Sequence, residues 1–79
     1  DENITIYPLP ATEKIFIELN HSHDIQEIVI HDVNQRVVYE NTEFRNRTHE
    51  INISKFDSGI YFVILSINNE KIIKKIVKE

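Results

Sequence analysis

Isoleucine dominates the apolar residues of this chain and constrains its fold more than any other feature. Of the 32 apolar residues, 15 are isoleucine and 6 are valine, whereas 3 are leucine and 1 is alanine. β-branched side chains are stiff at χ1 and pack well on a pleated sheet, whereas leucine and alanine favour helices. The composition therefore predicts an all-β protein before any pattern along the chain is considered.

Short apolar runs separated by turn residues predict seven strands, a number that suits a small antiparallel sandwich of two sheets. Pro8 and Pro10 end the first strand, because proline cannot donate to a ladder. The last strand also fits helical spacing, but so short a helix is marginal alone, and the Asn68-Asn69 pair before it suits a hairpin turn. The predicted strands cover Ile4–Tyr7, Lys14–Leu19, Glu27–Val33, Arg36–Glu40, Thr48–Ile53, Ile60–Ile67 and Lys71–Val77.

The third and sixth of these strands are the most apolar of the seven. Residues 28–30 are dense enough in apolar side chains for burial on both faces. Residues 60–67 are apolar on both faces, which indicates a central strand. Residues 33–36 predict a tight turn after the third strand, in which Asn34 suits a positive φ and Gln35 does not.

Asp57, Gly59 and Tyr61 form a pattern that is typical of a corner between two sheets. In immunoglobulin-like sandwiches, a tyrosine near the start of a central strand hydrogen-bonds back to the loop before it. Gly59 suits a backbone shape that other residues resist. We expect a structural role for these residues and not a catalytic Asp–Tyr pair.

A chain of 79 residues makes one small domain at most, and we expect residues 1–79 to be one domain cut from a longer protein. It contains no methionine, so Asp1 is expected to be a cut end, with any signal peptide upstream. It contains no cysteine, which excludes disulfides and thiolate metal sites. No apolar run approaches the roughly 18 residues of a membrane span, and one glycine leaves no loop to cradle a phosphate.

Positive charge is concentrated at the end of the chain. Residues 1–70 carry 12 acidic and 5 basic residues, whereas residues 71–79 carry Lys71, Lys74, Lys75 and Lys78 against Glu79. One interpretation is an edge strand whose lysines discourage unwanted pairing. The other is a basic docking tail. A nucleic-acid partner is disfavoured, because the acidic body would repel phosphates and no basic patch is interleaved with aromatic residues.

The sequence predicts neither catalysis nor a cofactor. His21 and His23, with Asp24 beside them, have the spacing of a metal-binding pair, but no third ligand supports them, and solvent-exposed histidines are the better account. His31 and His49 lie on predicted strands. The serines are scattered, none sits in a nucleophile elbow, and a body this small offers no cleft of the usual enzyme size. We therefore expect no enzyme, no metal site and no small-molecule substrate.

Several short motifs occur along the chain, and their order is more informative than any one of them. The first is the segment from Ile4 to Lys14 around Pro8-Leu9-Pro10, followed by His31-Asp32-Val33-Asn34-Gln35-Arg36-Val37-Val38-Tyr39. Ile51-Asn52-Ile53-Ser54 and Ser58-Gly59-Ile60-Tyr61-Phe62-Val63 come next, and Lys74-Lys75-Ile76-Val77-Lys78-Glu79 comes last. From Ile4 to Glu79, this ordered set closely resembles the C-terminal sorting domain of proteins exported by the type IX secretion system of Bacteroidetes.

The resemblance implies a seven-stranded immunoglobulin-like sandwich at the C-terminus of a larger exported cargo protein, so Glu79 is expected to be a true C-terminus. Such cargo enters the periplasm, and the folded domain is recognised by the outer-membrane translocon. A sortase-like protease at the cell surface commonly removes the domain and joins the cargo to an anionic lipopolysaccharide. Two positions depart from the family pattern: Leu9 replaces the asparagine of Pro-Asn-Pro, and Gln35 replaces a glycine of the first hairpin turn.

Combining the resemblance with the charge pattern, we expect Lys71, Lys74, Lys75 and Lys78 to contact the translocon on a scaffold held by Pro8, Pro10, Asp57, Gly59 and Tyr61. The domain is expected to be a monomer, or to self-associate weakly through an edge strand. The alternative is an immunoglobulin-like accessory module that binds carbohydrate or acts as a spacer. Its signature would be an exposed aromatic platform, but the spacing of Tyr7, Phe16, Tyr39 and Phe44 does not suggest one shared face.

Overall fold

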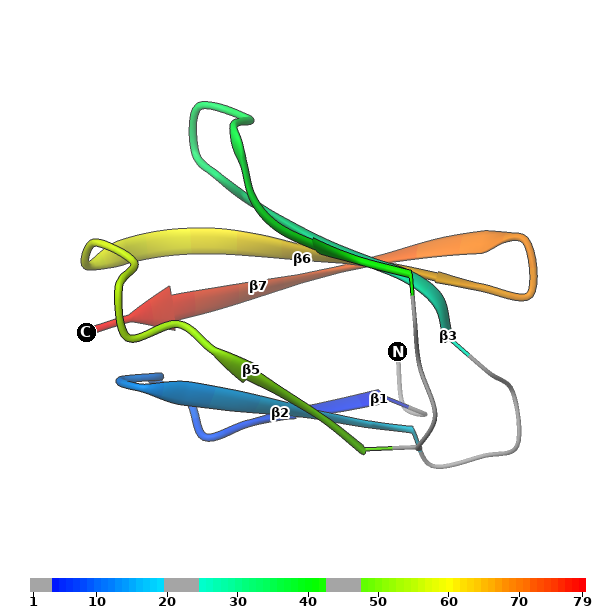
Figure 1. The fold of residues 1–79 in the computed structure, drawn as a ribbon, viewed down its shortest axis with the longest axis horizontal. Helices are drawn as coiled ribbons and strands as arrows, with labels where there is room; N and C mark the ends of the chain where they lie inside the picture. Colours follow the sequence, from blue (N-terminus) through cyan, green and yellow to red (C-terminus); the bar gives the residue numbers. More distant parts are fainter. Residues whose placement is uncertain (1–3, 20–24, 43–47) are drawn as a thin grey trace.

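The computed structural model describes residues 4–19, 25–42 and 48–79, which form seven β-strands and no helix (Figure 1). The predicted all-β sandwich is therefore confirmed. The strands are β1 (Ile4–Tyr7), β2 (Lys14–Leu19), β3 (Ile25–Asp32), β4 (Val37–Asn41), β5 (Thr48–Asn52), β6 (Gly59–Ile67) and β7 (Glu70–Lys78). The described residues contain no helix long and apolar enough to cross a membrane.

The strands form two antiparallel sheets that face each other (Figure 1). One sheet has three strands in the order β1-β2-β5, and the other has four in the order β4-β3-β6-β7. The strand β6 lies between β3 and β7, as its apolar sequence predicts. The strand β7 pairs with β6 alone among the described strands, so it forms an edge of the larger sheet.

The core lies between the sheets and consists of aliphatic side chains that alternate along the strands. Ile15, Ile17 and Leu19 point inward from β2, and Tyr61, Val63, Leu65 and Ile67 point inward from β6. No polar or charged residue of the described ranges is buried. The complete buried set comprises Ile4, Ala11, Ile15, Ile17, Leu19, Ile25, Ile28, Ile30, Ile51, Ile53, Tyr61, Val63, Leu65, Ile67 and Ile76.

Burial on both faces, predicted for residues 28–30, is wrong. Ile28 and Ile30 are fully buried between the sheets, but Val29 points to the opposite side of the sheet and is only partly covered. The same holds in β6, where Ile60 is 41% exposed. The outer side of the four-stranded sheet is therefore apolar, although no described segment packs over it.

The turn between β3 and β4 differs from the prediction. The strand β3 spans Ile25–Asp32 instead of Glu27–Val33, and β4 spans Val37–Asn41 instead of Arg36–Glu40. Gln35 and not Asn34 has the positive φ, of 66°. The physical cause of this difference is the side chain of Asp32.

The carboxylate of Asp32 organises this turn. Its Oδ1 accepts hydrogen bonds from the backbone N–H groups of Asn34, at 2.8 Å, and Arg36, at 3.0 Å, and its Oδ2 pairs with Nε of Arg36 at 2.9 Å. The N–H of Gln35 donates to the Asp32 carbonyl oxygen. These bonds hold Asn34 at a negative φ and place the left-handed conformation one residue later.

The last segment is a strand, as predicted, and not a helix. Asn68 and Asn69 both have positive φ values, of 56° and 66°, which is the conformation that a two-residue hairpin turn requires. Asparagine tolerates this conformation better than most residues. The turn sets the register in which Ile64 pairs with Ile73 and Phe62 pairs with Lys75.

The segment after β1 joins the two sheets at the end of β7. The strand β1 stops at Tyr7, and the peptide bonds preceding Pro8 and Pro10 are both cis. The fully buried Ala11 donates its N–H to the carbonyl oxygen of Val77 at 2.8 Å and accepts the N–H of Glu79 at 2.8 Å. The C-terminal end of the β7 edge is thereby covered.

Candidate functional site

The loop from β5 to β6 forms a tyrosine corner. The hydroxyl of Tyr61 donates a hydrogen bond to the backbone carbonyl oxygen of Asp57 at 2.7 Å, and its ring lies 5.1 Å from that of Phe56. Burial and the negative charge of Asp57 raise the pKa of the Tyr61 hydroxyl. Because the backbone of Asp57 accepts the bond, its carboxylate takes no part in it.

Gly59 lies at the start of β6 with a φ of 151°. No heavy atom lies within 4 Å of the position that a Cβ would occupy. The reason for glycine here is therefore the backbone conformation, which L-residues rarely adopt, and not a lack of space.

The four lysines of β7 do not share one face. Side chains alternate along a strand, so Lys71 and Lys75 point outward beside Ser66 and Phe62 of β6, and both are exposed. Lys74 and Lys78 lie on the side of the buried Ile76 and are half-buried at the margin of the sandwich. The strand therefore carries two pairs of lysines on opposite sides.

The two pairs also differ in their contacts. Within residues 4–19, 25–42 and 48–79, Lys71 and Lys75 form no ion pair. Lys78 donates from Nζ to the backbone oxygen of Glu79 at 2.9 Å. The outward pair is thus the more available for a charged partner.

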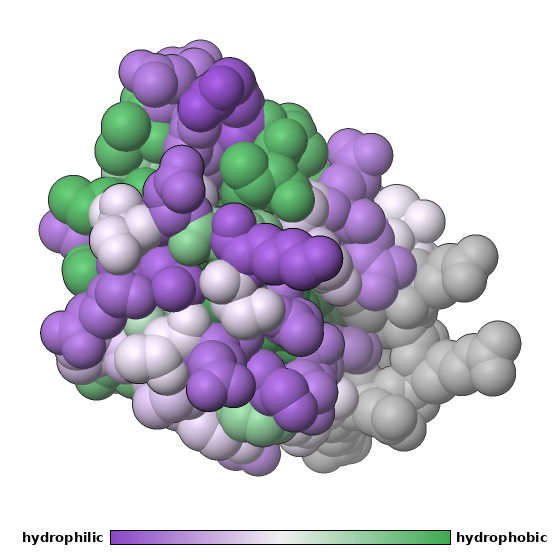
Figure 2. Space-filling view, turned by 60° about the vertical axis from the view of Figure 1, so that its left-hand side comes forward, coloured by the Kyte–Doolittle hydropathy of each residue, from purple (hydrophilic) through white to green (hydrophobic). Residues whose placement is uncertain are grey.

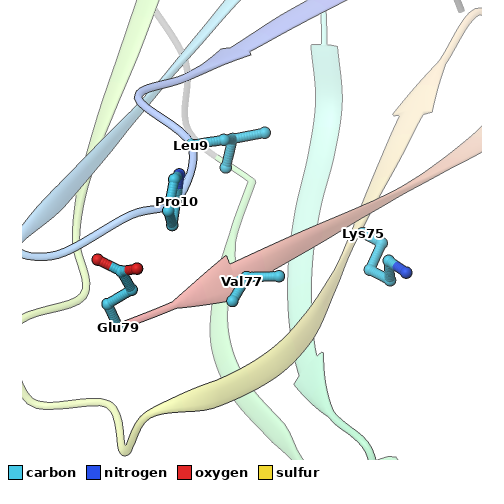
Figure 3. A pocket seen from close by; sticks show the side chains of 5 residues that line it. All are labelled: Leu9, Pro10, Lys75, Val77 and Glu79. Atoms are coloured by element: carbon cyan, nitrogen blue, oxygen red, sulfur yellow. The ribbon is translucent and has the colours of Figure 1, made fainter.

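The backbone edge of β7 is open over part of its length. The backbone N–H and C=O groups of residues 71, 73 and 75 point away from β6, and no described strand pairs with them. Beside this edge lies a shallow groove of about 350 Å³, lined by Leu9, Pro10, Lys75, Val77 and Glu79 (Figure 3). Its walls come from the cis-proline segment and from β7, and they are mainly apolar.

The histidines form no evident metal site in the described residues. The ring of His31 donates from Nδ1 to the backbone carbonyl oxygen of Asp32 at 2.8 Å and lies 5.4 Å from the ring of Phe62. Burial lowers the pKa of His49. In the described part of the chain, no three His, Asp or Glu side chains gather. His21, His23 and Asp24 lie outside the described residues.

Comparison with protein families decides what kind of domain carries this edge strand. A family model described as a secretion system C-terminal sorting domain matches residues 5–79. The chain belongs to this family. The match covers the ordered motifs that resemble the type IX sorting domain, and the family is one of sorting signals and not a class of enzymes. The comparison with curated proteins finds no match.

Both departures of this sorting domain from the family pattern fall in turns that the structure describes. Gln35, which stands where the family usually has glycine, has a positive φ of 66°. Leu9, which stands where the family usually has asparagine, is 52% exposed and lines the groove beside β7. The first departure places a strained residue in a turn, and the second adds an apolar side chain to the surface near the lysines.

Two of the four aromatic residues considered for a shared face lie together, and a third lies apart from them. The rings of Tyr7 and Phe16 stack at 5.4 Å across β1 and β2, so these two residues do share a face. Tyr39 lies on β4 in the other sheet, and Phe44 lies outside the described residues. Cross-strand register, which sequence spacing does not reveal, brings the two rings together.

Proposed function

We propose that this domain is a C-terminal signal that directs an attached cargo protein from the periplasm across the outer membrane through the type IX translocon. Membership of the sorting-domain family supports a role in secretion. In this proposal the translocon recognises β7, and a sortase-like protease at the cell surface then removes the domain and anchors the cargo to an anionic lipopolysaccharide. Residues 1–79 act as an address on a larger exported protein, not as a catalyst.

The observation that carries the proposal is the position of β7. This strand holds four of the six lysines of the chain, whereas residues 1–70, which include its first residue Glu70, have a net charge of −7. It is an edge strand, so its backbone and side chains are reachable between Lys71 and Lys75. A sorting label has to present a feature that its cargo lacks, and a basic edge on an acidic body is such a feature.

The experiment replaces Lys71, Lys74, Lys75 and Lys78 together with glutamine. Residues 1–79 are fused to a fluorescent reporter with a periplasmic signal peptide in a bacterium that has a type IX system. We expect the wild-type fusion to reach the cell exterior and the variant to remain in the periplasm. Normal export of a folded variant contradicts recognition through these lysines.

Substitution is a sharper test than deletion of residues 71–79. Ile76 is 1% exposed and belongs to the core, so deletion removes core packing along with the lysines. The melting temperature of each variant chain separates loss of recognition from loss of folding. A single-site control is Lys55→Gln, which removes one exposed lysine from the β5–β6 loop.

Proteolytic removal of the domain is measured separately, from the mass and the location of the reporter. An exported reporter that is cleaved at the surface loses about the mass of the fused domain, and an anchored one stays with the cells. Recovery of only full-length reporter outside the cell would contradict cleavage while leaving the export function in place.

The stacked Tyr7 and Phe16 are the observation that favours the alternative, a carbohydrate-binding accessory module. Their rings lie at 21° to each other and 5.4 Å apart, so each ring covers a face of the other. A sugar platform needs ring faces open to solvent, which this stack reduces. Retention of the chain on a polysaccharide column, abolished by Tyr7→Ala, would support this alternative.

A further inference from the structure

The outer face of the four-stranded sheet is apolar across three strands. We use "outer face" for ten of the side chains that point away from the three-stranded sheet: Val29 and His31 of β3, Ile60, Phe62, Ile64 and Ser66 of β6, and Lys71, Ile73, Lys75 and Val77 of β7. Glu27 of β3 and Glu40 of β4 point to the same side and lie at its margin. The register places them in rows, with Val29, Ile64 and Ile73 in one row and His31, Phe62 and Lys75 in the next. Ile73 is 63% exposed and Val77 is 42% exposed.

The opposite side of the sandwich has a different character. On the three-stranded sheet, exposed Thr5, Thr48 and Asn52 surround the Tyr7–Phe16 stack. Lys14 and Glu50 form an ion pair there at 3.1 Å. One outer side is thus mainly polar, while the other exposes aliphatic side chains. A contiguous exposed apolar surface on a small domain marks an interaction site.

The two margins of the outer face carry opposite charges. Lys71 and Lys75 lie along its β7 margin, and neither forms an ion pair within the described residues. Glu27 lies on β3 opposite Ser66, and Glu40 lies on β4 opposite Val29, so the other margin is acidic. A partner that covers this surface with carboxylates opposite Lys71 and Lys75 matches both its apolar centre and its basic margin.

The groove beside β7 extends the outer face at this basic margin. Lys75 and Val77 belong to both, and Leu9 and Pro10 form the far wall (Figure 3). The apolar side chains of Leu9 and Val77 make this groove suited to an aliphatic side chain of the partner. Exposed apolar residues also occur at the β3–β4 end of the molecule: Val33 lies in the turn, and Val37 begins β4 opposite His31. Figure 2 shows hydrophobic side chains in the upper part of the molecule, below a hydrophilic tip.

We propose that the secretion system recognises this domain through the outer face, by a protein surface with an apolar centre and carboxylates opposite Lys71 and Lys75. This inference rests on the proposed sorting function and narrows it. Of the four lysines of β7, only Lys71 and Lys75 contact the partner. Ile73 lies between these two lysines on the strand. Lys74 and Lys78, on the other side of β7, lie outside this contact.

The test places a carboxylate in the centre of the outer face and compares it with an equal change elsewhere. Ile73→Glu alters a side chain that is 63% exposed, and the control Val33→Glu alters one that is 62% exposed in the β3–β4 turn. In the reporter fusion, we expect Ile73→Glu to lower the exported fraction about ten-fold, because a carboxylate there must be desolvated in an apolar contact and repels the partner's carboxylates opposite Lys71 and Lys75. Val33→Glu should leave export unchanged.

A second pair of variants tests the charge pattern and does not disturb the apolar residues. Lys71→Gln with Lys75→Gln is compared with Lys74→Gln with Lys78→Gln, which removes the same charge from the same strand. We expect the outward pair to lower export and the inward pair to leave it near wild type. Replacing the outward pair with arginine should retain export.

The outcomes separate this inference from the proposed function. If the four-lysine variant stays in the periplasm while Ile73→Glu is exported normally, the sorting function stands and the outer-face contact is wrong. Sedimentation of the 79-residue chain tests whether a second copy of the chain covers the outer face instead. A dimer that Ile73→Glu dissociates while export persists would assign the face to self-association and overturn the proposal.

Discussion

The hydroxyl of Tyr61 lies 2.7 Å from the backbone carbonyl oxygen of Asp57 and donates a hydrogen bond to it. This bond connects the start of β6 to the loop that crosses from one sheet to the other. We predict that Tyr61→Phe destabilises the domain by about 1 kcal/mol, the usual net value of such a bond. Urea denaturation measures the change. Tyr7→Phe, at an exposed ring, is the control and should change little.

Gln35 has a φ of 66°, a conformation that costs an ordinary residue about 1 kcal/mol or more. We predict that Gln35→Gly stabilises the domain by up to about 1 kcal/mol, because glycine adopts this conformation without a steric cost. The matched change Asn34→Gly, one residue earlier at a negative φ, should be neutral or destabilising. A lower melting temperature for Gln35→Gly would mean that this turn conformation is wrong.

Ile76 and Ile73 lie on the same strand but have opposite environments, at 1% and 63% exposure. We predict that Ile76→Ala destabilises the domain by about 2 to 5 kcal/mol, as for other fully buried isoleucines. Ile73→Ala should cost less than about 1 kcal/mol. Equal effects in thermal unfolding would contradict the assignment of inner and outer sides to β7.

The carboxyl group of Asp32 makes the stability of the domain depend on pH. Hydrogen bonds from the backbone of Arg36, followed by the other donors of the turn, hold the pKa of its carboxyl below the usual 3.8. The folded state therefore binds this proton less readily than the unfolded state. Its contribution to stability is present above about pH 4 and is lost as the pH falls through the folded-state pKa.

The variant Asp32→Asn should lower the melting temperature at pH 7 and flatten its decline in acid. Thermal unfolding between pH 2 and pH 7, followed by circular dichroism, measures both effects. Coincident curves for the two proteins would show that the Asp32 bonds do not contribute to stability.

Most of the fold is predictable because isoleucine marks the strands so clearly. The alternation of Ile15, Ile17 and Leu19 defines a half-buried strand, and Asn68-Asn69 defines a hairpin. The turn at Gln35 is not predictable in the same way. There the bonds from Asp32 to Asn34 and Arg36 override the preference of asparagine for a positive φ.

The candidate site is only partly predictable. Side chains alternate between the two sides of a strand, so a β7 strand places Lys71 and Lys75 on one side and Lys74 and Lys78 on the other. The division of the lysines into two pairs could therefore have been predicted from the sequence. The apolar outer face was not predictable, because apolar residues on both sides of β6 suggest burial on both. Nor does any sequence pattern indicate that Ala11 hydrogen-bonds to Val77, since that contact depends on how the two sheets meet.

The most direct test of the sorting function is a measurement of sufficiency. A periplasmic fluorescent reporter is expressed with and without residues 1–79 at its C-terminus, in a bacterium with a type IX system and in a strain that lacks the translocon. We predict that the fluorescence reaches the cell exterior only when the domain and the translocon are both present. A folded fusion that stays in the periplasm of the translocon-containing strain, or one exported equally without the translocon, would contradict the account.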